Sequence, residues 1–243
     1  MIKLSINLNK VALLRNQRDI GYPSVIEAAR TVIRAGAHGI TVHPRPDERH
    51  IRRSDVRELA DLLATESHST EYNIEGNPEP EYMALVRDVR PTQATLVPDA
   101  PDQQTSDHGW DIAQEHERLK SIIRELHSYD IRVSLFVDPD ASVVAQAKEI
   151  GADRIELYTG PYAHAFGTAD EDAVFERYLY AAEAARDLGL GLNAGHDLNL
   201  ENLPKLRAAM PWLAEVSIGH AITADALWLG FEATVKAYLE ALY

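Results

Sequence analysis

The sequence predicts a single (β/α)8 TIM barrel, and two observations lead to this fold. Short apolar runs alternate with helical segments along all 243 residues, a pattern typical of a parallel sheet. Three of these runs, far apart in the sequence, each end on a histidine, namely His43, His196 and His220. The carboxyl ends of the strands meet at one mouth of a parallel barrel, so we expect these imidazoles to share one cleft. Because no Pro- or Ser-rich linker divides the chain, one barrel domain over residues 1–243 is favoured over a two-domain doubly wound fold.

The first half of the chain supplies four predicted strand–helix units. Leu4, Ile6 and Leu8 alternate with polar residues, as in a strand whose two faces differ. The next helix begins near Pro23 and ends near Gly36, which are typical residues for those positions. Pro98 ends the fourth strand. The predicted strands are 4–8, 40–42, 72–74 and 94–97, and the predicted helices are 23–36, 54–64, 79–89 and 112–127.

The second half repeats this pattern. Residues 35–40 and 150–155 form a weak internal repeat, in which a helix, a glycine turn and a strand follow one another. The polar segment 99–111 has no periodicity and is expected to form a long loop, either a lid or a plain surface excursion. The predicted strands are 131–137, 154–158, 191–193 and 215–218, and the predicted helices are 142–150, 171–188, 202–209 and 224–242.

The composition excludes several classes of function. The formal net charge is −14, which argues against wide contacts with nucleic acid or an anionic membrane. The chain has no cysteine, which removes disulfides, thiolate metal sites and cysteine nucleophiles together. No apolar stretch approaches the length of a membrane span and no signal peptide is visible, so we expect a cytoplasmic protein.

Titratable and cationic side chains gather at the predicted strand ends. Imidazoles titrate near neutral pH, buried glutamates can become bases, and Arg and Lys suit anionic substrates. Each residue also has a structural interpretation, such as a loop hydrogen bond, a surface ion pair or an inward ion pair. Four histidines could suffice for a metal, but no ligand pair of typical spacing is present, and no metal is expected. The candidates are Asn7, Asn9, Lys10, Arg15, Arg18, His43, Arg45, His50, Glu75, Thr105, Ser106, Glu156, Thr159, Asn193, Gly195, His196, Gly219 and His220.

Several motifs are distributed from the first predicted strand to the last predicted helix. They are Asn-Leu-Asn at 7–9, Leu-Arg-Asn-Gln-Arg at 14–18, residues 39–51, Asn-Ile-Glu at 73–75, Leu-Val-Pro at 96–98, Val-Ser-Leu-Phe at 133–136, residues 155–160, Asn-Ala-Gly-His at 193–196 and Ile-Gly-His-Ala at 218–221. The stretch from His43 to Ile51 and the two Gly-His pairs are the most specific of them. Together these motifs resemble the pyridoxine 5′-phosphate synthase family of vitamin B6 biosynthesis.

The resemblance implies a barrel with a few extra helices, usually assembled as a homo-octamer. It implies that 1-deoxy-D-xylulose 5-phosphate and 3-amino-2-oxopropyl phosphate condense to pyridoxine 5′-phosphate, phosphate and water, without cofactor or metal. His43 and Glu75 correspond to general bases, His196 to the general acid and Glu156 to a residue that stabilises charge. Contacts to the aminoketone phosphate correspond to Asn7, Arg18, Gly219 and His220, and contacts to the sugar phosphate to Arg45, His50 and Thr105.

Three residues depart from the pattern that the resemblance implies. Asn9 and Lys10 stand where many members have Asp-His, and Asp197 stands where glycine commonly follows the catalytic histidine. All three remain candidate substrate contacts. Lys10 can still donate to a phosphate, whereas a carboxylate at 197 would repel it unless it turns away.

Two other functions remain open from the sequence. A barrel aldolase or epimerase would act on a single sugar phosphate, and a Schiff-base aldolase would need a lysine in the middle of a strand. A catalytically impaired barrel that only binds a B6 phosphate would be compatible with the changes at 9, 10 and 197. Intact Glu75, His43 and His196 argue against the second alternative.

Overall fold

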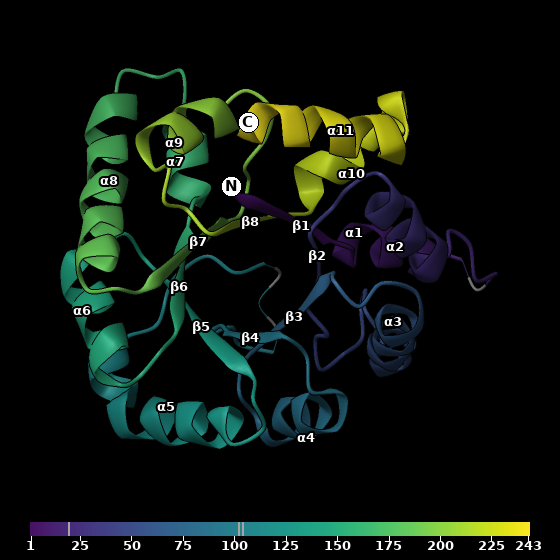
Figure 1. Cartoon of the computed structure of the whole chain (residues 1–243), viewed down its shortest axis with the longest axis horizontal. Helices are drawn as coiled ribbons and strands as arrows, with labels where there is room; N and C mark the ends of the chain where they lie inside the picture. Colours follow the sequence, from purple (N-terminus) through teal and green to yellow (C-terminus); the bar gives the residue numbers. More distant parts are fainter. Residues whose placement is uncertain (19, 102, 104) are drawn as a thin grey trace.

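The computed structural model describes residues 1–18, 20–101, 103 and 105–243. Eight parallel strands close into a barrel in sequence order, with β1 paired to both β2 and β8. Figure 1 shows the helices around this barrel. The predicted (β/α)8 fold is therefore confirmed. The strands are β1 (Lys3–Asn7), β2 (Gly39–Val42), β3 (Glu71–Gly76), β4 (Gln93–Leu96), β5 (Arg132–Val137), β6 (Arg154–Tyr158), β7 (Gly191–Gly195) and β8 (Glu215–Ile218).

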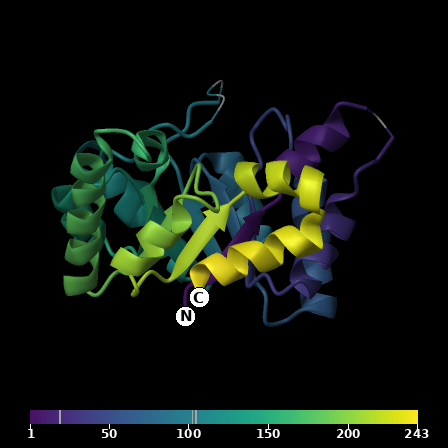
Figure 2. The same cartoon turned by 90° about the horizontal axis from the view of Figure 1, so that it is seen from above.

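The helices follow the strands along the chain, and in the described residues none is long and apolar enough to cross a membrane. Figure 2 shows that both chain termini lie at one end of the barrel and that α10 lies toward the other. The helices are α1 (Asn9–Asn16), α2 (Val25–Arg34), α3 (Arg53–Glu66), α4 (Pro80–Val89), α5 (Ile112–His127), α6 (Ala141–Glu149), α7 (Gly160–Ala165), α8 (Glu171–Asp187), α9 (Leu203–Ala209), α10 (His220–Leu229) and α11 (Phe231–Leu242).

Three predictions about the elements were wrong. Residues 9–16 form helix α1 rather than a loop, and residues 160–165 form the short helix α7. The predicted helix 224–242 is two helices, because Gly230 has φ 77° and interrupts the helical backbone between α10 and α11. Strand β7 also extends to Gly195, two residues beyond the predicted end.

Alternation along the strands separates an apolar outer face from a polar interior. On β1, Leu4 and Ile6 are fully buried, as expected for residues that face the surrounding helices. The residues between them belong to a hydrogen-bonded belt inside the barrel. Ser5 Oγ lies 2.7 Å from Thr41 Oγ1, Asn73 Nδ2 donates to the same Thr41 oxygen, and Thr95 Oγ1 donates to Asn73 Oδ1. The barrel interior is therefore rich in polar groups, and not in the branched apolar residues that dominate many barrels. Not all of these groups are paired, because Ser134 Oγ, Asn193 Nδ2 and Glu215 Oε1 have no hydrogen-bond partner among the described residues.

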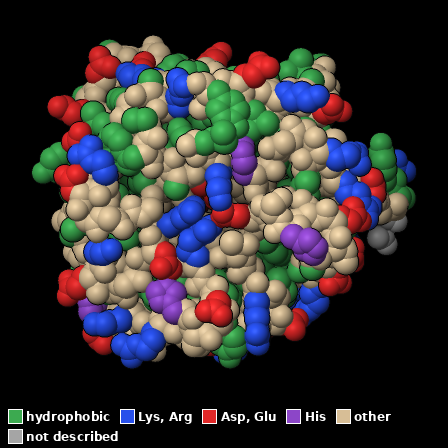
Figure 3. Space-filling view, viewed as in Figure 1, with side chains coloured by type: hydrophobic (Ala, Val, Ile, Leu, Met, Phe, Trp, Pro, Cys, Tyr) green, Lys and Arg blue, Asp and Glu red, His purple; other side chains and the backbone are tan. Residues whose placement is uncertain are grey.

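Charged residues close the end of the barrel where the strands begin. Glu71 on β3 forms ion pairs with Lys3 of β1 and Arg132 of β5, and Arg154 of β6 donates to Asn193 Oδ1 at 3.1 Å. Figure 3 is drawn from the side on which the N-terminus lies, and Lys and Arg side chains gather near the middle of that face. These pairs give the half-buried carboxylate of Glu71 two positive partners.

A buried ion pair attaches α1 to the first turn of α3. Arg15 and Asp55 have side chains only 9% and 7% exposed, and Arg15 Nη2 donates to Asp55 Oδ2 at 2.9 Å. The same carboxylate accepts from Arg52 N, which caps the start of α3. Arg15 thus has a structural role in an ion pair, but the pair is buried and not the surface pair that the sequence suggested.

We expect Asp55→Asn to lower the free energy of unfolding by about 3 kcal/mol, because it leaves a buried guanidinium without its counter-charge. Urea denaturation followed by circular dichroism measures this loss. Asp61→Asn, an exposed position on the same helix, is the matched control and should change stability by less than about 0.5 kcal/mol. Equal stabilities of the two variants would contradict this role of the pair.

Candidate active site

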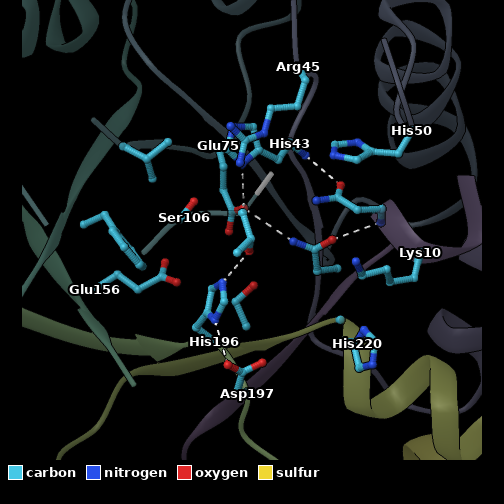
Figure 4. Close-up of a pocket in the computed structure, with 17 residues that line it drawn as sticks. Lys10, His43, Arg45, His50, Glu75, Ser106, Glu156, His196, Asp197 and His220 are labelled. Atoms are coloured by element: carbon cyan, nitrogen blue, oxygen red, sulfur yellow. Dashed lines mark hydrogen bonds and ion pairs between the residues drawn. The ribbon is translucent and has the colours of Figure 1, made fainter. Parts of the chain in front are cut away.

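A cavity of about 430 Å³ lies at the mouth where the strands end, and it unites most of the predicted site residues. Figure 4 shows these side chains converging from both sides of the barrel. Arg18 is exposed beyond the end of α1 and does not line this cavity, and neither do the candidates Arg15, Thr159, Asn193 and Gly195. The predicted residues that line it are Asn7, Asn9, Lys10, His43, Arg45, His50, Glu75, Thr105, Ser106, Glu156, His196, Asp197, Gly219 and His220.

Two glutamates from different strands occupy the floor of the cavity. Glu75 on β3 accepts from Asn7 Nδ2 at 3.4 Å, and its side chain is 13% exposed. Burial and the nearby Asp99 raise the pKa of Glu75 to about 8. Glu156 on β6 is buried, and its Oε2 has no hydrogen-bond partner among the described residues. Burial, followed by the charges of Glu75 and Glu215, raises the pKa of Glu156 well above its ordinary value.

The glycine at the end of β7 makes space for the second carboxyl group. A Cβ atom on Gly195 would lie 2.2 Å from Glu156 Oε1, which no real structure tolerates. The absence of a side chain at 195 is therefore a steric requirement for the position of Glu156, and the Gly-His motif serves the carboxyl group as well as the histidine.

His43 follows β2 and faces both Glu75 and the loop after β4. Its Nδ1 lies 3.6 Å from Glu75 Oε2, and its backbone N–H donates to Asn9 Oδ1 at 2.9 Å. Burial and the neighbouring cation Arg45 hold the pKa of His43 well below 6.5. The ring is therefore neutral at physiological pH and can accept a proton from a bound molecule.

His50 lies edge-on to His43, with ring centroids 6.4 Å apart. Burial and the charges of Arg45 and Lys10 lower the pKa of His50 to about 4. Its Nδ1 accepts the backbone N–H of Ile51 at 2.9 Å, so the neutral ring carries its proton on Nε2. His50 is therefore a neutral hydrogen-bond donor at the cavity.

Asp99, the acidic partner of Arg45, was not among the predicted site residues. Arg45 Nη2 lies 2.6 Å from Asp99 Oδ2, and Ser106 Oγ donates to the same oxygen. Both side chains are buried, yet Arg45 Nε and Asp99 Oδ1 lack partners among the described residues. Apolar Val97 and Phe136, which also line the cavity, were missed as well. The position of Asp99 directly after Pro98, at a strand end, was the one signal that could have found it.

His196 leaves the end of β7 and approaches the segment after β4 through Thr105. Its Nε2 lies 2.9 Å from Thr105 Oγ1, and its Nδ1 lies 3.2 Å from Asp197 Oδ2. The ring also packs edge-on against Tyr158, with centroids 5.2 Å apart. Both nitrogens are therefore engaged, and one of them faces the cavity.

The remaining side of the cavity offers groups suited to an anion. The N-terminus of α10 begins at His220 after Gly219, and Lys10 lies in the first turn of α1. Free backbone N–H groups at a helix start favour negative charge. A Cβ on Gly219 would lie 3.0 Å from Asn7 Cβ, so glycine permits the close approach of β8 to β1. Within the described parts of the chain, no group of three or more His, Asp or Glu is arranged to hold a metal ion.

The raised pKa of Glu75 predicts how stability depends on pH. Between about pH 4.5 and 8 the folded protein binds more protons at this group than the unfolded chain does, so the free energy of unfolding falls as pH rises. Glu75→Gln keeps the shape and does not ionise. We expect the free energy of unfolding of the variant, relative to that of the wild type, to increase as pH rises through this window. The increase should be at most about 1.4 kcal/mol per pH unit.

Urea denaturation at several pH values measures that difference. Glu240→Gln, which removes an exposed carboxylate from α11, is the control, and its curve of unfolding free energy against pH should stay parallel to that of the wild type. A Glu75→Gln curve that also stays parallel to the wild type would contradict the buried, protonated state.

Comparison with known proteins gives a family. The family model described as pyridoxal phosphate biosynthesis protein PdxJ matches residues 4–243. A pyridoxine 5′-phosphate synthase of Albidiferax ferrireducens is 54% identical over 99% of this chain and 97% of its own. The pyridoxine 5′-phosphate synthase of Porphyromonas gingivalis is 50% identical over 100% of this chain and 99% of its own.

A solved structure gives the fold alone. Phosphoribosyl anthranilate isomerase from Thermotoga maritima superimposes with a TM-score of 0.64 at 16% identity, over 100% of this chain and 98% of that one. The sequence matches are much closer and cover the whole barrel. The chain belongs to the pyridoxal phosphate biosynthesis protein PdxJ family.

Proposed function

We propose that this protein is a pyridoxine 5′-phosphate synthase. It joins 1-deoxy-D-xylulose 5-phosphate to 3-amino-2-oxopropyl phosphate and releases pyridoxine 5′-phosphate, phosphate and water. The observation that carries the proposal is the meeting of Glu75, His43, Glu156 and His196 in one cavity with Arg45 and Lys10. The names of its relatives support the same reaction.

The acid–base groups suit the steps of this condensation. Amine addition to a ketone, dehydration, phosphate elimination and ring closure all move protons. Glu75, in its ionised form, and neutral His43 lie on the same side and serve as general bases. His196, on the opposite strand, serves as the general acid. Glu156 lines the same cavity with a buried carboxyl group and stabilises the charge that develops between them.

Phosphate groups bind at two sides of the cavity in this proposal. Asn7, Gly219 and His220 take the aminoketone phosphate at the start of α10, with Arg18 as a further contact. Arg45, His50 and Thr105 take the sugar phosphate, and Arg45 exchanges its pairing with Asp99 for the substrate. Asn9, Lys10 and Asp197 complete the rim. The chemistry needs no cofactor or metal, and holding both substrates together lowers the entropic cost of reaction.

The aldolase alternative has little support from the positions of the lysines. A Schiff-base aldolase needs a lysine amine inside the mouth of the barrel. Lys10 is the lysine that lines the cavity, and it lies on α1 and not on a strand. Lys3 is on β1, but it pairs with Glu71 at the other end of the barrel.

We propose further that the protein is a cytoplasmic homo-octamer of one-domain subunits. Helix α10 exposes three consecutive large apolar residues, with Trp228 86%, Leu227 69% and Leu229 55% exposed. Ile20 and Tyr22 are also exposed near the mouth-side helix α1. Contiguous apolar groups of this kind are typical of protein interfaces and support self-association.

Activity is tested by mixing the purified protein with both substrates, without added metal, and following pyridoxine phosphate and released phosphate. The product should appear, and Glu75→Gln or His196→Asn should slow it by about 10²–10⁴-fold with the fold intact, because each removes a proton-transfer group. Glu240→Gln is the control. No product from the wild type, or a Glu75→Gln variant with wild-type turnover, would contradict the proposal.

Trp228→Glu should reduce the molar mass measured by light scattering, because it puts a charge into the proposed interface. Tyr180→Glu, at an aromatic residue on α8 that is 68% exposed, is the matched control and should leave the mass unchanged. A monomeric wild type, or a Trp228→Glu variant of unchanged mass, would contradict the oligomer.

A further inference from the structure

The turn after β7 holds two successive residues in an unusual backbone conformation. His196 has φ 91° and Asp197 has φ 57°, a region that residues other than glycine seldom adopt. Side chains from two other elements hold the turn. Thr159 Oγ1 lies 2.7 Å from the Gly195 carbonyl and 2.6 Å from the His196 carbonyl, and Asn202 Nδ2 donates to the Asp197 carbonyl at 3.2 Å. Non-glycine residues kept in this region concentrate at functional sites.

This turn brings the carboxylate of Asp197 against the imidazole of its own neighbour. Asp197 Oδ2 lies 3.2 Å from His196 Nδ1. An ionised carboxylate only accepts hydrogen bonds, so Nδ1 carries the proton in this pair. His196 Nε2 then faces Thr105 and the cavity, and it is the nitrogen that gains and releases a proton (Figure 4).

The charges around the pair keep the carboxylate ionised. The hydrogen bond from His196, together with the charges of His220 on α10 and Lys10 on α1, lowers the pKa of Asp197. On the other side of the ring, burial and the charges of Asp197, Asp107 and Asp138 raise the pKa of the Tyr158 phenol. Tyr158 therefore stays neutral beside the imidazole.

We propose that Asp197 is a positioning residue for His196 and not chiefly a substrate contact: its carboxylate fixes the imidazole with Nδ1 protonated, so that Nε2 is presented to the substrate. The role rests on the proposed function of His196 as general acid. It also accounts for a carboxylate beside a phosphate site. The carboxylate is turned toward the imidazole, and the cation of Lys10 offsets its charge at the rim.

The first test needs no turnover. The full-length protein is labelled with ¹⁵N-histidine and studied at alkaline pH, where a free imidazole is neutral, with His196→Asn used to assign the signal. We expect the Nδ1–H form of His196 in the wild type and a shift toward the Nε2–H form in Asp197→Gly. Glycine suits the φ of 57°, so the thermal midpoint of this variant should equal or exceed that of the wild type.

The second test compares kcat with KM. Asp197→Gly should lower kcat by about ten- to a hundredfold, because the acid is no longer aligned, without raising KM. The kcat of Asp197→Asn should fall between those of the wild type and of Asp197→Gly, because the amide oxygen can still accept a hydrogen bond from Nδ1–H. Glu201→Gln removes an exposed carboxylate from the same loop and should change neither constant.

Two results would overturn the proposal. One is an Nε2–H form of His196 in the wild type, or a form that Asp197→Gly leaves unchanged. The other is an unchanged kcat with a lower KM in Asp197→Gly, which is the signature of a rim charge that only repels substrate. An inactive wild type that still shows the Nδ1–H form would reject the proposed synthase function while leaving the positioning role in place.

Discussion

Glu75 and Glu156 are buried in the mouth of one barrel, and the chemistry of the site follows from that constraint. Each carboxyl group lies in a poorly solvated position, and the charge of Glu75 raises the pKa of Glu156. The two groups therefore resist simultaneous ionisation and titrate as a pair. Such a pair can provide one carboxylate as a base while the other keeps its proton, and the same mouth supplies a neutral imidazole at His43.

The polar interior of the barrel makes this burial possible, and it has a cost in stability. Inward positions on the strands carry Ser5, Thr41, Asn73 and Thr95, which bond to one another in a belt beneath the two glutamates. The apolar residues that stabilise the fold lie on the outer face, between the strands and the helices. Within each strand, the residues that stabilise the fold and the residues that form the site are thus on different faces, because successive side chains point to opposite sides. The strained turn at His196 follows the same division, since its support comes from neighbouring elements.

Most of the barrel and of its mouth could be predicted, because alternation and strand-end position are local properties of the sequence. The convergence of residues as distant as Glu75 and His196 followed from the closure of a parallel sheet. Helix α1 could not be predicted from its apolar pattern, since much of its stability comes from tertiary contacts such as the buried pair of Arg15 with Asp55. Asp99 was missed because its role depends on the fold of a loop that has no periodicity.

The most direct test of the account is a ¹³C NMR titration of the Glu75 carboxyl group in the resting protein. The account predicts an apparent pKa near 8 for this group, with a second inflection that disappears in Glu156→Gln because the partner no longer titrates. A single transition near 4.5, unaffected by that substitution, would show a solvated and independent carboxylate and would contradict the buried pair at the centre of the site.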